Sequence, residues 1–110
     1  MIQDHIEKIE TKVQGAKGIT EETRNELIGL LSTLKTEIGD LSKTHGEDAD
    51  SITRFAEVSA HEATREEKKP ELVKVAVQGL SSSVSGFESS HPGLVQIVNR
   101  IATILSNMGI

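Results

Sequence analysis

The last stretch of the chain, residues 87–110, most strongly constrains how the protein can fold. Pro92 fits the first position of a helix, because its fixed φ angle suits a helix start and its missing N–H is not needed there. In the helix that follows, apolar residues cover about half of the circumference, and Arg100 is the only charged residue after Glu88. An apolar face of this width must be covered by other helices of the chain, by a second copy or by a partner.

A second apolar stripe follows Thr20, which fits the N-cap position of a helix. Glu21 and Glu22 then occupy the first turn, where negative charge interacts favourably with the helix dipole. The large apolar residues after them recur at alternating spacings of four and three, which is the pattern of a single helix face. We call the stripes of these two helices the interaction seam, and its residues are Leu27, Leu31, Leu34, Ile38, Leu41, Leu94, Val98, Ile101, Leu105 and Met108.

The N-terminal segment predicts a short amphipathic helix that pairs with the leucine-rich helix. Two glycines within residues 15–18 provide a helix stop and a short connection between the two helices. We therefore predict an acidic helical hairpin over residues 1–45, with coiled-coil-like packing. The apolar residues of the first helix, at the same spacing of four and three, are Ile2, Ile6, Ile9 and Val13.

Residues 46–69 predict a third helix and a charged connection. The register of the leucine-rich helix continues past residue 41, so one helix from Thr20 to about Glu66 is an alternative to a break. We favour the break, because Gly46 fits a position just after a helix and residues 47–51 resemble a new helix start. The stripe of this third helix is narrow and consists of Ala49, Ile52, Phe55, Ala56 and Ala63.

Residues 70–110 predict a C-terminal helix pair. Pro70 opens the first helix, whose apolar spacing continues to Phe87 through many Ser and Gly residues, with a kink near Gly86 as a plausible feature. The second helix begins at Pro92, and Gly109 is placed to cap its end. The fold class is therefore all-α: a single domain over residues 1–110, built as a four- or five-helix bundle that we expect homo-oligomerisation to complete.

The composition narrows the classes of partner and compartment. The chain contains no cysteine, which excludes disulfides and thiolate metal sites. It shows neither a secretion signal nor an uninterrupted apolar run of membrane-spanning length, so we expect a cytoplasmic protein. The net charge of −5 lies in residues 1–50, and no Trp or Tyr is available to stack on bases. We therefore expect neither nucleic acid nor a membrane as a partner.

Two Glu/His pairs are the candidates for a metal site. Glu88 and His91 have the Glu-x-x-His spacing found in di-metal helical bundles, and Glu57 and His61 are four residues apart. A di-metal site requires two such motifs and two further carboxylates, whereas the chain holds one motif. We therefore prefer a structural interpretation, in which His91 or Ser90 caps the last helix and no cofactor is bound.

Arg100 is the one charged residue within the apolar C-terminal helix. It can pair with Glu88, pair with an acid of the leucine-rich helix, or extend its charged end into water from the edge of the apolar face. We favour the third arrangement.

The C-terminal third resembles a known family. The motif Phe87-Glu88-x-x-His91-Pro92 and the ending Leu105-Ser106-Asn107-Met108-Gly109-Ile110 are similar to those of a bacterial family of short all-helical proteins, catalogued as a domain of unknown function. The similarity extends from about Leu72 to Ile110. The resemblance implies an all-helical fold and carries over no functional residues.

Three functional hypotheses follow. The leading one is a non-enzymatic helical protein that self-associates, with a dimer favoured, or contacts an unidentified protein partner through the interaction seam. The second is a small metal-binding bundle that uses the Glu/His pairs. The third is an adaptor whose acidic N-terminal hairpin binds a basic protein.

Overall fold

The chain forms five helices and, over the part that is described, no strands. The computed structural model describes residues 2–109, and it describes side chains from Gln3 onward, so the predicted contribution of the Ile2 side chain lies outside the described residues. The helices are α1 (Ile2–Gln14), α2 (Glu21–Ser42), α3 (Gly46–Thr64), α4 (Pro70–Ser83) and α5 (Pro92–Met108). The prediction of an all-α bundle is confirmed, with five helices.

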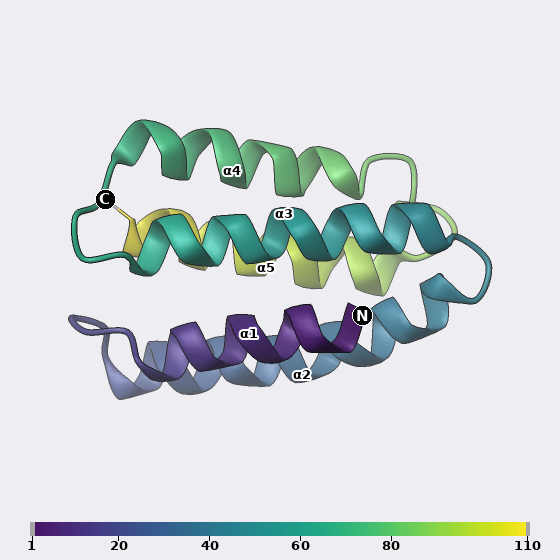
Figure 1. The fold of residues 1–110 in the computed structure, drawn as a ribbon. Helices are drawn as coiled ribbons and strands as arrows, with labels where there is room; N and C mark the ends of the chain where they lie inside the picture. Colours follow the sequence, from purple (N-terminus) through teal and green to yellow (C-terminus); the bar gives the residue numbers. More distant parts are fainter. Residues whose placement is uncertain (1, 110) are drawn as a thin grey trace.

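The helices are arranged in three layers (Figure 1). The antiparallel pair of α1 and α2 packs on one side of α3 and α5, with α1 against α3 and α2 against α5. Helix α4 packs on α3 and α5 from the other side. The middle layer is therefore covered on both sides. Within the described part of the chain, no helix is long and apolar enough to cross a membrane.

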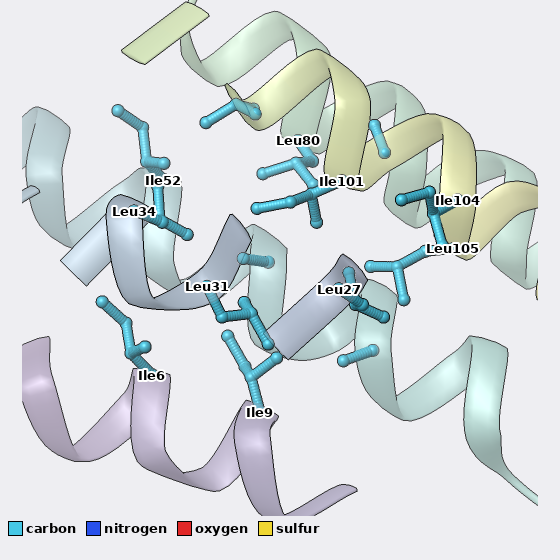
Figure 2. Close-up of a cluster of buried hydrophobic side chains, with 14 of the residues drawn as sticks. Ile6, Ile9, Leu27, Leu31, Leu34, Ile52, Leu80, Ile101, Ile104 and Leu105 are labelled. Atoms are coloured by element: carbon cyan, nitrogen blue, oxygen red, sulfur yellow. The ribbon is translucent and has the colours of Figure 1, made fainter. Parts of the chain in front are cut away.

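The core lies between these layers and is almost entirely aliphatic (Figure 2). Every helix contributes to it, and both outer layers pack against α3 and α5 in the middle layer. Because neither Trp nor Tyr is present, close packing of branched side chains supplies most of the buried apolar area. The largest fully buried side chains are Ile6, Ile9, Leu27, Leu31, Leu34, Ile38, Leu41, Ile52, Leu80, Leu94, Ile101 and Leu105.

Arg24 on α2 stabilises the N-terminal hairpin through hydrogen bonds to the end of α1. Its guanidinium donates hydrogen bonds to the backbone carbonyls of Val13, Gln14 and Ala16 at 2.7, 2.8 and 3.0 Å. These carbonyls lie at and just beyond the end of α1, where no further turn of helix supplies N–H donors. The connection then reverses at Gly18, which has a φ of +82° that favours glycine.

The start of α2 and the break before α3 agree with the sequence analysis. The Thr20 hydroxyl accepts a hydrogen bond from the backbone N–H of Thr23 at 3.1 Å, as predicted for an N-cap. Helix α2 ends at Ser42, so the break is confirmed. Gly46, however, is the first residue of α3 and does not end α2, because His45 occupies the N-cap position.

Helix α4 is shorter than the apolar spacing predicts. It ends at Ser83, whose hydroxyl donates to the carbonyl of Leu80 at 2.6 Å, a local bond that competes with continued helix. Gly86 has a φ of +98°, which turns the chain where a kink was expected. Val84 remains buried although it lies beyond the helix, so the apolar spacing predicted its burial but not its conformation.

The C-terminal end of α5 is held by the connection between α3 and α4. The Lys68 ammonium donates to the carbonyl of Met108 at 2.7 Å. Gly109 caps the helix as predicted, and a Cβ atom at this position would lie 2.7 Å from the Val73 methyl groups. Glycine is therefore needed here for close approach to α4.

We expect Ile101→Asp to lower the free energy of unfolding by more than about 4 kcal/mol, because it places an unpaired charge in the core. The Ile101 side chain is 1% exposed, and the exposed position Gln96 on the same helix provides a matched control. Urea unfolding followed by circular dichroism measures both variants. Gln96→Asp should change stability by less than about 0.5 kcal/mol, and equal loss in the two variants would contradict the placement of α5.

We expect Ser59→Ala to raise the free energy of unfolding by about 1 kcal/mol. The Ser59 hydroxyl is fully buried and finds no hydrogen-bond partner among the described residues. Thr53 is the matched control, since its buried hydroxyl donates to the carbonyls of Ala49 and Asp50 at 3.2 and 2.9 Å. Thr53→Ala should lower stability by about 1–2 kcal/mol. A loss of stability in Ser59→Ala would show that its hydroxyl has a partner.

Candidate interaction surface

The interaction seam lies inside the chain. Its five residues on α2 are at most 1% exposed, and its five residues on α5 are at most 9% exposed. These side chains contact the other helices of the same chain (Figure 2). A second copy cannot reach them while the five helices stay packed. A surface for a partner therefore has to lie elsewhere.

Four large apolar residues of α3 and α4 are exposed instead. Phe55 and Val58 on α3 are 42% and 49% exposed, and Leu72 and Val75 on α4 are 42% and 65% exposed. The two helices are adjacent and antiparallel (Figure 1). We call these four residues the apolar strip. A contiguous exposed apolar surface on a small protein is often a binding site.

The exposure of Phe55 corrects its predicted place in the buried stripe of α3. A Cβ atom at Gly79 on α4 would lie 2.4 Å from the Phe55 ring, so the ring rests directly on the Gly79 backbone. The rest of the α3 stripe consists largely of small residues, so its neighbours approach too closely to admit a ring. Phe55 therefore lies at the outer edge of the contact between α3 and α4.

Charged side chains border the apolar strip. On α3, Arg54 forms a salt bridge with Asp50 at 2.7 Å, and its side chain is 66% exposed. Near the other end of the strip, the Glu62 side chain is only 13% exposed and accepts a hydrogen bond from Arg65 at 3.1 Å. The exposed charged border of the strip is therefore the Arg54–Asp50 pair on α3.

The side chains of Glu88 and His91 contact different neighbours. The Glu88 carboxylate accepts a hydrogen bond from the backbone N–H of Gly86 at 2.8 Å and so caps the turn after α4. The His91 Nδ1 atom lies 2.9 Å from the Ser90 hydroxyl. Neither Ser90 nor His91 makes the predicted side-chain cap on α5, although His91 is the N-cap residue.

The His91 ring belongs to a small aromatic cluster with Phe87 and His45. The ring centroids are 5.7 Å apart for His91 and Phe87, 6.2 Å for the two histidines and 5.5 Å for His45 and Phe87, all in edge-to-face geometry. The cluster joins the start of α3 to the start of α5, which gives both histidines a packing role.

Glu57 and His61 also have separate neighbours. Glu57 contacts the His5 Nδ1 atom at 2.5 Å, which links α3 to α1, and both side chains are about three-quarters buried. The ring of His61 lies 4.0 Å from the carboxylate of Glu62. Within residues 2–109, no group of three or more His, Asp or Glu side chains is arranged to hold a metal ion.

Arg100 pairs with an acid of α2. Its Nε and Nη2 atoms donate to the same carboxylate oxygen of Glu26 at 3.0 and 2.8 Å. The arrangement favoured from the sequence, a charged end directed only into water, is therefore wrong. The two side chains are about half exposed, so the pair adds less to stability than the apolar contact beneath it.

We expect zinc or iron(II) in excess to leave the melting temperature unchanged, because the side chains of Glu88 and His91 are held by other groups. A metal bound to the folded chain alone would raise this temperature by mass action. Differential scanning calorimetry with and without metal measures the effect, with a chelator as control. A rise that disappears in His91→Ala would contradict this assignment.

Comparison with known proteins gives one match. No curated protein sequence and no solved structure matches the chain significantly. The model of one family matches residues 29–110, a range that includes the C-terminal third on which the sequence resemblance rests. The match covers most of α2 and all of α3, α4 and α5. The chain therefore belongs to the family described as Domain of unknown function (DUF4404).

Proposed function

We propose that the chain is a non-enzymatic interaction protein that associates with itself through the apolar strip on α3 and α4. The observation that carries this proposal is the exposure of Phe55, Val58, Leu72 and Val75 on two adjacent helices. Burial of these side chains between two copies removes apolar surface from water. The interaction seam, in contrast, stabilises the folded chain.

The environment of the polar candidates supports an interaction role over a catalytic one. Glu88 caps a turn, His91 packs in an aromatic cluster, and Glu57 pairs with His5. Each of these groups therefore has a structural partner that accounts for its position. A catalytic centre needs polar groups that converge on a shared substrate position.

The size of the apolar strip sets the expected strength of association. Stable interfaces bury about 800 Å² on each partner, whereas four partly exposed side chains offer a few hundred Å² at most. Exposed residues around the strip must then contribute the remaining area. We expect a reversible dimer with a dissociation constant on the order of micromolar.

We expect Val75→Asp to abolish self-association without unfolding the chain, because Val75 is 65% exposed and a carboxylate is tolerated in water but not inside an apolar interface. Analytical ultracentrifugation over a range from low to high micromolar concentration measures the mass. Gln96→Asp, which adds the same charge at an exposed position of α5, is the control and should dimerise like the parent chain.

Two results would contradict the proposal. The first is a parent chain that remains a monomer over the whole concentration range. The second is a Val75→Asp variant that keeps the parent melting temperature and associates as strongly as the Gln96→Asp control.

A further inference from the structure

We propose that Met108, the last residue of α5, is an oxidation-sensitive site. Its conversion to methionine sulfoxide by a peroxide loosens the end of α5 from α4 and from the connection before α4. The chain contains no cysteine, so its sulfur chemistry is limited to two methionines. Met108 is the one that lies within the described residues, and the inference does not depend on the proposed self-association.

Met108 belongs to the apolar core when its sulfur is reduced. The residue is 9% exposed and lies in the same buried cluster as Ile104 and Leu105, one turn earlier on α5. A thioether is apolar and flexible, so it packs well among aliphatic side chains. A sulfoxide carries a polar oxygen, which loses its hydrogen bonds with water if it stays in the core. Oxidation therefore favours a Met108 side chain that has left the core.

A cleft of about 330 Å³ gives solvent a route to this residue. It lies between the start of α2, the connection before α2 and the last turns of α5, and Met108 lines it together with Ile104 and Asn107. Hydrogen peroxide is only slightly larger than water, so it fits this space. A peroxide therefore has a path to Met108 that does not require the chain to unfold.

The reaction is a two-electron oxidation of the Met108 sulfur. A sulfur lone pair attacks one oxygen of hydrogen peroxide, the O–O bond breaks and an S–O bond forms. The attacked OH group passes its proton to the departing hydroxide, so the second product is water. The sulfur loses two electrons and the peroxide gains two, which makes the peroxide the only co-reactant.

The rim of the cleft offers hydrogen-bond donors to the oxidised side chain. Asn107 is exposed there and carries an amide NH₂ group. Arg100 uses its Nε and Nη2 atoms for Glu26, which leaves its Nη1 atom for another acceptor. A sulfoxide turned toward the cleft is hydrated and within reach of such donors, whereas a thioether gains nothing there. The reduced side chain therefore favours the core and the oxidised one favours the cleft.

The last turn of α5 transmits this change to the start of α4, which lies beside it (Figure 1). Lys68, in the connection before α4, donates to the carbonyl of Met108 at 2.7 Å. Gly109 lies so close to Val73 that a Cβ atom would be 2.7 Å from its methyl groups. Both contacts require the last turn to stay against the core. Displacement of the Met108 side chain therefore loosens residues 65–73 as well as the end of α5.

The rate of oxidation by dilute hydrogen peroxide tests the route through the cleft. Mass spectrometry of proteolytic peptides measures Met108 separately from Met1. We expect Met108 to be oxidised about tenfold to a hundredfold more slowly in the folded chain than in the chain unfolded by urea, because it is largely buried. Oxidation that requires unfolding would be slower by at least about 1,000-fold, the smallest usual ratio of folded to unfolded chains. A rate that low would overturn the proposal.

The melting temperature and amide exchange of the oxidised chain test the consequence. Oxidation of the parent chain should lower its melting temperature by roughly 5 °C or more and speed exchange in residues 65–73 and 105–109. Met108→Leu keeps a similar apolar volume and is the matched control. Met1 can still be oxidised in this variant, so its melting temperature should not change with peroxide. An equal fall in Met108→Leu, or no change in a parent chain oxidised at Met108, would overturn the proposal.

Discussion

The packing of α2 against α5 is the contact on which the rest of the structure depends. The two halves of the interaction seam meet there, and together with α1, α3 and α4 they form a core with no Trp or Tyr. Aliphatic side chains of this kind stabilise the chain only when they are closely packed, since each contributes roughly 1.5–3 kcal/mol when fully buried. Because the seam is completed within one chain, the wide apolar face of α5 needs no second copy. Among the side chains that the structure describes, the large apolar ones that stay exposed are those of the small strip on α3 and α4.

Several contacts stabilise the helix ends that surround this core. Arg24 satisfies the carbonyls at the end of α1, and Lys68 does the same for Met108 at the end of α5. The cluster of His45, Phe87 and His91 joins the starts of α3 and α5. The Lys68 and aromatic contacts join residues that are distant in sequence, so tertiary structure as well as local caps fixes the helix ends. The motif from Phe87 to Pro92, on which the family resemblance rests, contributes Phe87 and His91 to this cluster.

The sequence predicted the helices well because their periods and caps are local. The stripes of α2 and α5, the Thr20 cap and the proline starts all follow from residues within a few positions of one another. The end of α4 was missed because serine hydroxyls and Gly86 override a spacing that continues to Phe87.

The residues of the apolar strip were mostly not predicted, because the exposure of a side chain depends on which helix covers which face. Val58, Leu72 and Val75 are apolar residues that lie outside the predicted buried stripes. This mismatch was the sequence signal that could have indicated their exposure. Phe55 fitted the stripe of α3, and only the neighbouring Gly79 shows why its ring lies outside. Arg100 likewise found Glu26, a residue that only the packing of α2 on α5 brings near.

The central claim is that one chain buries its own seam and leaves the strip for contact with a second copy. Amide hydrogen exchange measured at nanomolar and at high micromolar concentration tests it most directly. We expect residues 94–108 of α5 to be equally protected at both concentrations, and residues 55–58 and 72–75 to gain protection only at the higher one. Loss of protection in α5 on dilution would contradict the account, because it would show that the seam is buried by association and not by folding of the single chain.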